Sequence, residues 1–170
     1  NDAGFFYASR RADAVTFAPF AGNVSEAVEQ AHGRGVGVIV LSLMSNAEYA
    51  AEKAQPTGPD GVPRYRRIAE DAIAAGADGL VVGAPSDSNH ITGEEVEAVR
   101  ECMGAGPVVL TPGVGAQNGT AMSMWQVFQS DQVIVNASRS LMFPEGSESS
   151  PEQQAAAARE LRRRLNEERS

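Results

Sequence analysis

Cysteine and lysine are almost absent from this sequence, which contains one of each, Cys102 and Lys53, in 170 residues. One cysteine excludes a disulfide framework and a cysteine metal cluster, so Cys102 is expected to be a buried, inert thiol. No apolar run approaches the ~20 residues of a membrane-spanning helix, and the first residues lack the pattern of a secretory signal. These features predict a cytoplasmic protein without membrane contacts.

Positive charge is also scarce, because 14 basic residues stand against 22 acidic ones and give a net charge of −8. Non-specific binding to nucleic acid needs a basic surface, so nucleic acid is not an expected partner. One bound phosphate remains compatible with this charge, since a local pocket outweighs the field of distant groups.

Strand and helix signals alternate along the chain. Five apolar segments predict strands, at residues 14–19, 36–43, 79–84, 108–111 and 133–137. Residues 1–6 have a helical pattern, and further helices are expected at 26–32, 47–53 and 65–75, the first of them capped by Ser25. Another helix is expected after a capping box formed by Thr92 and Glu95. A last helix is expected to begin at Ser150 and Pro151. Residues 55–63 are rich in glycine and proline and are expected to form no regular element.

Repeated strand–helix units without an intervening hairpin predict an α/β fold with a parallel sheet. A closed TIM (β/α)8 barrel needs eight strands and ~250 residues. The five units therefore predict that residues 1–170 are the C-terminal part of one barrel domain, with a five-stranded doubly wound domain as the alternative. In such a partial barrel, Val38, Val40, Val82 and Val109 are expected to line an uncovered interior.

Two neighbouring segments favour phosphate binding. A loop at residues 112–119, Pro-Gly-Val-Gly-Ala-Gln-Asn-Gly, follows the fourth strand, and Arg139 follows the fifth. Glycine allows backbone N–H groups to approach an anion closely, and a guanidinium can form two hydrogen bonds with one phosphate. Together they indicate a barrel that binds a phosphorylated small molecule.

Four segments resemble the orotidine 5′-phosphate decarboxylase family: residues 13–20 (Asp-Ala-Val-Thr-Phe-Ala-Pro-Phe), 41–46 (Leu-Ser-Leu-Met-Ser-Asn), 112–117 (Pro-Gly-Val-Gly-Ala-Gln) and 135–139 (Val-Asn-Ala-Ser-Arg). They follow the order of that barrel's strands four to eight. The resemblance implies conversion of orotidine 5′-phosphate to uridine 5′-phosphate in pyrimidine synthesis, by a homodimer without metal or organic cofactor.

The resemblance also implies roles for individual residues. Gln117 and Arg139 would hold the substrate phosphate, Gly115 and Ala116 would offer backbone groups to it, and Ser45 would bind the pyrimidine ring or the closing loop. The family's catalytic lysine lies in an Asp-x-Lys-x-x-Asp motif, which is absent here. Lys53 is expected on a solvated helix face, so the catalytic segment is expected upstream of Asn1 and the fragment alone is expected to be inactive.

Alternative interpretations remain open. A hexulose-phosphate synthase could use the same barrel with magnesium ligands on other strands, and a non-catalytic phosphate-binding module could begin near Asn1. His32 and His90 are isolated in the sequence and are expected to be helix-end or loop residues. Asp13 and Asp78 precede strands and are expected to be turn or cap residues.

Overall fold

The computed structural model describes residues 2–114 and 121–169. Its centre is a parallel sheet of five strands in the order β1-β2-β5-β6-β7. The strands are β1 (Ala14–Phe17), β2 (Gly37–Leu43), β5 (Gly79–Val82), β6 (Val108–Pro112) and β7 (Val133–Asn136). All five predicted strands are confirmed, each within a few residues of its expected limits.

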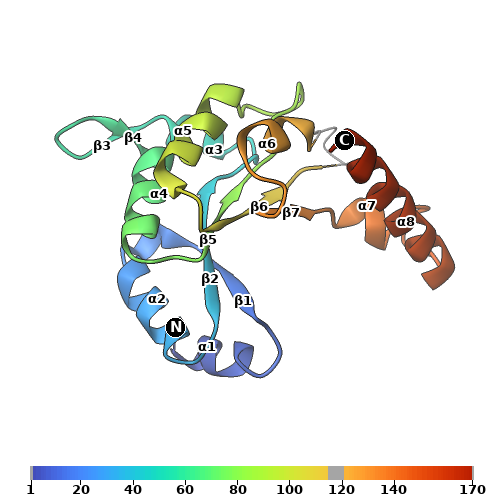
Figure 1. Cartoon of the computed structure of the whole chain (residues 1–170), viewed down its shortest axis with the longest axis horizontal. Coiled ribbons are helices and arrows are strands. Elements are labelled where there is room, and N and C mark those ends of the chain that lie inside the picture. The colour runs from blue at the N-terminus through green and yellow to red at the C-terminus, as the bar shows by residue number, and fades with distance from the viewer. Residues whose placement is uncertain (1, 115–120, 170) are drawn as a thin grey trace.

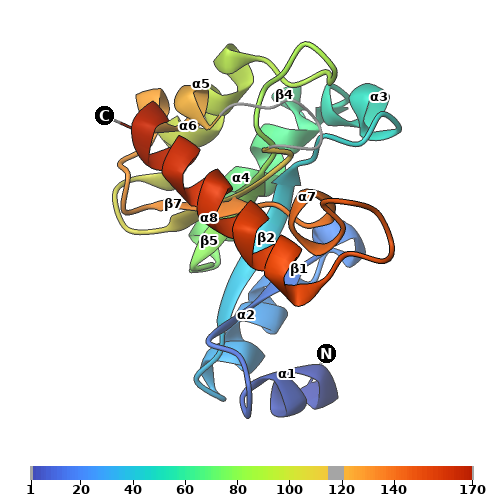
Figure 2. The ribbon, with the colours of Figure 1, turned by 90° about the vertical axis from the view of Figure 1, so that its right-hand side faces the viewer.

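Eight α-helices occur in the described residues: α1 (Asp2–Ala8), α2 (Val24–His32), α3 (Tyr49–Lys53), α4 (Arg64–Ala74), α5 (Gly93–Met103), α6 (Met122–Val127), α7 (Arg139–Met142) and α8 (Pro151–Glu168). Figure 1 shows α2, α4, α5 and α6 along one side of the curled sheet, whereas α7 and α8 extend beyond β7. Figure 2 shows the length of α8. None of the helices in the described ranges is both long enough and apolar enough to cross a membrane.

The expected helices are largely confirmed, but the predictions for the Ser25 cap and for residues 55–63 are wrong. Thr92 and Ser150 both form capping boxes, at α5 and α8. The predicted Ser25 cap is wrong, because α2 begins at Val24, two residues earlier than expected, with Asn23 at its N-cap position. Residues 55–63 do form regular structure, since β3 (Pro56–Thr57) and β4 (Val62–Pro63) pair as a short antiparallel hairpin. That hairpin is held by a hydrogen bond from Thr57 Oγ1 to the Val62 carbonyl (2.8 Å), which a count of glycines and prolines does not reveal.

The two faces of the sheet differ in burial. Val40, Leu80 and Val109 are register neighbours on adjacent strands and are fully buried in the core that the helices cover. The next row contains Leu41, Val81, Leu110 and Ile134, and Ile134 at its end is 45% exposed. Side chains alternate between faces along a strand, so this second row forms the other face of the sheet.

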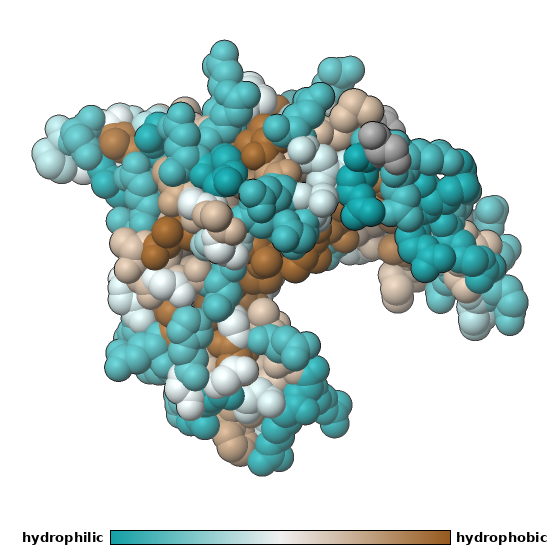
Figure 3. All heavy atoms as spheres, viewed as in Figure 1, coloured by the Kyte–Doolittle hydropathy of each residue, from teal (hydrophilic) through white to brown (hydrophobic). Residues whose placement is uncertain are grey.

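The expectation that Val38, Val40, Val82 and Val109 line the open interior is therefore wrong, because all four belong to the helix-covered core. A buried parallel strand is apolar at successive positions, so its sequence does not reveal which valines face the helices. Apolar surface lies along the wall of the hollow in Figure 3. The curled five-stranded sheet with one open apolar face is consistent with a partial TIM barrel.

Candidate functional site

The carboxyl ends of the parallel strands meet at one edge of the sheet, where ligands of open and closed α/β sheets bind. Two cavities lined by described residues lie at this edge. One is formed by the segments after β6 and β7, and the other by the segments after β2 and β5.

The cavity after β6 and β7 has a volume of about 180 Å³ and brings the two predicted phosphate-binding segments together. Its lining residues are Pro112, Gly113, Val114, Asn136, Ala137, Ser138, Arg139 and Ser140. Gly113 has a φ of 96°, a left-handed conformation that favours glycine and turns the chain out of β6. Gly115, Ala116 and Gln117 lie outside the described residues.

Arg139 is an exposed residue at the start of α7. Ion pairs within the described part of the chain involve other arginines, such as Arg34, Arg66, Arg67 and Arg163. An arginine that lines a small cavity together with Gly113 and Val114 can form a charge-assisted pair of hydrogen bonds with a phosphate.

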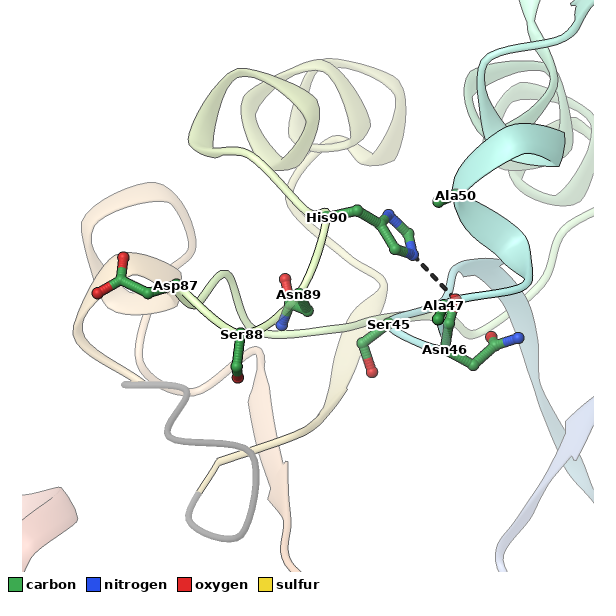
Figure 4. A pocket seen from close by; sticks show the side chains of 8 residues that line it. All are labelled: Ser45, Asn46, Ala47, Ala50, Asp87, Ser88, Asn89 and His90. Carbon is green, nitrogen blue, oxygen red and sulfur yellow. Dashed lines mark hydrogen bonds between the residues drawn. The ribbon is translucent and has the colours of Figure 1, made fainter.

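The cavity after β2 and β5 is larger, about 650 Å³, and both of its walls carry polar side chains. Figure 4 shows its lining side chains: Ser45, Asn46, Ala47 and Ala50 from the segment after β2, and Asp87, Ser88, Asn89 and His90 from the segment after β5. Asn89 stabilises its own loop, because its side chain binds the Ala84 carbonyl (2.9 Å) and the Ile91 N–H (2.9 Å). Ser45 therefore lies in a cavity that has polar side chains on both of its walls.

Gly83 determines how closely the two walls of this cavity approach. A Cβ at residue 83 would lie 2.6 Å from Cδ1 of Ile91 and 3.0 Å from Cβ of Ser45. The Gly83 N–H also donates to the Leu43 carbonyl (2.8 Å). The role of Gly83 was not predicted from the sequence, because a glycine at the end of a strand can serve several structural purposes. The contacts with Ile91 and Ser45 show which of these applies.

Lys53 does not lie on a solvated face, contrary to expectation. It is 6% exposed, and its ammonium is 2.6 Å from Oε2 of Glu95. The α3 helix that carries it is anchored by Tyr49, whose hydroxyl donates to the Ser42 carbonyl (2.9 Å) and whose pKa is raised to about 12 by burial. The short α3 packs against the protein with Lys53 inward.

The other singled-out residues have structural roles. His32 does have a carboxylate partner, since its Nε2 is 2.8 Å from Oδ2 of Asp78. The same Asp78 oxygen accepts the Val38 N–H (2.7 Å), so Asp78 fixes the start of β2, at the opposite end of the strands from the cavities. The thiol of Cys102 is half-buried rather than fully buried, and burial raises its pKa.

Comparison with solved structures identifies the fold. Orotidine 5′-phosphate decarboxylase from Leishmania donovani superposes with a TM-score of 0.69 at 23% identity, covering 99% of this chain and 64% of that one. The enzyme of Methanocaldococcus jannaschii, complexed with the inhibitor BMP, has a TM-score of 0.64 at 18% identity, covering 95% of this chain and 67% of that one.

Sequence comparison identifies the family as well as the fold. Proteins named orotidine 5′-phosphate decarboxylase are 33% identical over 163 residues in Bordetella avium and 35% identical over 159 residues in Variovorax paradoxus. These matches cover 92% and 89% of this chain but only 57% and 55% of the relatives, so the chain spans about half their length. The family model described as orotidine 5′-phosphate decarboxylase / HUMPS matches residues 3–157, and the chain therefore belongs to this family.

Proposed function

We propose that this chain is the C-terminal part of an orotidine 5′-phosphate decarboxylase and forms the substrate-binding half of its barrel. The observation that carries the proposal is the pair of cavities at one edge of the sheet. A nucleotide has a phosphate at one end and a pyrimidine ring at the other. The cavity with Arg139 has the charge for the phosphate, and the cavity with Ser45 has the volume and polar lining for the ring.

In this proposal, Arg139 holds the phosphate together with Gln117 and the backbone of Gly115 and Ala116. Ser45 donates or accepts a hydrogen bond at the ring or at the closing loop. Binding energy from the phosphate, which is remote from the reacting carbon, stabilises the closed and ordered site. The chain's own residues thus bind and orient the substrate.

The chemical step needs a group that these residues do not supply. Breaking the bond between C6 and the carboxylate releases CO₂ and leaves the electron pair on C6. A nearby ammonium stabilises that negative charge and then donates its proton to C6. Lys53 is unsuited to this role, because its ammonium is already paired with Glu95 in the interior. We expect the lysine from an Asp-x-Lys-x-x-Asp motif on further barrel strands, in a homodimer.

Turnover of orotidine 5′-phosphate, followed by its change in ultraviolet absorbance, tests the proposal. We expect decarboxylation by the protein in which this chain is completed by the remaining barrel strands, and none above background by the 170 residues alone. Turnover by the pure 170-residue chain would contradict the assignment of the missing ammonium. A completed protein that binds uridine 5′-monophosphate but has no turnover would favour a binding module instead.

A further inference from the structure

The buried ammonium of Lys53 joins two strand–helix units next to the larger cavity. Besides Glu95 on α5, it contacts the backbone carbonyl oxygen of His90, at 2.5 Å from Nζ. The Lys53 and Glu95 side chains are only 8% and 18% exposed. Because charge-assisted hydrogen bonds in a buried setting have demanding geometry, this contact fixes His90 relative to α3.

The imidazole of His90 extends the connection to the loop that carries Ser45. Its Nε2 is 3.0 Å from the backbone carbonyl oxygen of Asn46, a contact drawn in Figure 4. A carbonyl can only accept a hydrogen bond, so Nε2 must carry the hydrogen. The other ring nitrogen, Nδ1, is buried and has no hydrogen-bond partner among the described residues. His90 therefore acts toward this loop as a donor.

Glu95 completes the connection at its other end. Its Oε2 also accepts the Thr92 N–H (3.0 Å), and its own N–H donates to Thr92 Oγ1 (3.3 Å). The first turn of α5 is thereby linked through Lys53 and His90 to Asn46. Ser45, the neighbour of Asn46, also lies close to Gly83, since a Cβ built on that glycine would be 3.0 Å from Cβ of Ser45.

We infer that His90, held by Lys53 and Glu95, is a positioning residue that orients Ser45 for the pyrimidine ring of the nucleotide. This inference rests on the proposed function, because it assigns the ring to the cavity of Ser45. A hydroxyl is effective only when it is aimed at its partner. Loss of the His90 hydrogen bond frees the Asn46 carbonyl and loosens the adjacent serine, while the phosphate cavity between β6 and β7 is unchanged.

Calorimetric titration of the full-length protein with uridine 5′-monophosphate and with uridine separates ring binding from phosphate binding. His90→Phe keeps an aromatic ring but removes the donor, and we expect both ligands to bind about three- to tenfold more weakly. The ratio of the two affinities should stay at its wild-type value. His90→Gln restores an N–H donor at a similar reach, and we expect affinities within about twofold of wild type.

A second pair of variants tests the residues behind His90. Lys53→Met combined with Glu95→Gln removes the cation without leaving a buried carboxylate unpaired, and glutamine can still serve in the capping box. We expect the same loss of affinity for both ligands. Arg66→Met is the matched control, because it removes a cation that pairs with Glu70 and Glu101 away from the cavity. Its affinities should equal those of wild type, and thermal melts establish that each variant is folded.

Different outcomes overturn different statements. His90→Phe with wild-type affinity for both ligands, or a loss confined to the phosphorylated ligand, overturns the positioning role of His90. Failure of His90→Gln to restore binding in a folded protein also overturns it, since the donor would not be what matters. A wild-type protein that binds neither ligand would overturn the proposed function itself.

Discussion

Pro112 and Asn136 are register partners at the carboxyl ends of β6 and β7. Parallel strands that end side by side place the segments that follow them next to each other. Arg139, three residues after Asn136, consequently shares a cavity with Gly113 and Val114. Two segments separated by more than twenty residues of sequence thus line one small cavity.

Arg139→Ala should weaken binding of uridine 5′-monophosphate by about ten- to hundredfold, because a hydrogen bond to a charged group contributes about 1.5–3 kcal/mol. Binding of uridine should change little. Arg139→Lys should recover only part of the loss, since an ammonium cannot form the paired contact of a guanidinium. Arg163→Ala, on the exposed α8, is the control. Unchanged nucleotide affinity in Arg139→Ala would remove this residue from the site.

Gly83→Ala should destabilise the protein by about 1–3 kcal/mol, because the new methyl group overlaps Ile91 and Ser45. Combining it with Ile91→Val, which removes the nearest carbon atom, should recover part of that stability. Gly93→Ala at the start of α5 is the control, since a Cβ there meets nothing within 4 Å. Urea unfolding of the four proteins measures these differences, and equal stability of Gly83→Ala and wild type would contradict the close approach.

The stability of the fold should depend on pH through the carboxyl group of Asp78. Burial raises the pKa of Asp78, but hydrogen bonds from His32 and from the Val38 N–H outweigh it, and the net pKa lies below the ordinary value for aspartate. A carboxyl group with a lowered folded-state pKa stabilises the fold above its unfolded pKa, and this stabilisation is lost as the pH falls through the folded value. Asp78→Asn should therefore be less stable than wild type at neutral pH. As the pH falls below about 5, the variant should lose less stability than wild type does. Chemical denaturation at several pH values measures both differences. An unchanged acid profile would contradict this role.

The 170-residue chain alone should be poorly soluble or molten. β1 and β7 are the outer strands of the sheet, and unpaired strand edges promote association between chains. The open face that ends in Ile134 loses about 25 cal/mol for each Å² of apolar surface left in water. We expect binding of the dye ANS and a broad thermal melt, both reversed by adding the missing strands in trans. A cooperative, monomeric melt of the isolated chain would support a self-sufficient five-stranded domain.

The fold was predictable where local signals were strong. Apolar runs such as 36–43 and 108–111 mark buried parallel strands, and Thr92 with Glu95 marks a helix start by hydrogen-bond chemistry alone. The hairpin at Pro56 and Val62 was missed because glycine and proline also mark irregular loops, and the segment has no hydrophobic alternation that would indicate strands.

The candidate site was predictable only in part. Arg139 and the start of the glycine-rich loop could be paired in advance, because parallel strand order places their segments side by side. The environments of Lys53 and His90 could not be predicted, since both depend on contacts between residues about 40 positions apart in the sequence. A charged residue on a short helix is usually solvated, whereas Lys53 is directed inward, where its ammonium contacts Glu95 and the His90 carbonyl.

Because the only lysine in the sequence is buried, its chemical reactivity can be used to measure local opening of the structure around α3. Reagents that acylate amines react with the free, unprotonated group, and in this chain Lys53 is the one side chain that offers it. In the closed state the amine is buried and in contact with Glu95, which shields it from the reagent. Acylation can then proceed only when α3 separates transiently from α5, so its rate measures the free energy of that opening, as hydrogen exchange does for backbone amides.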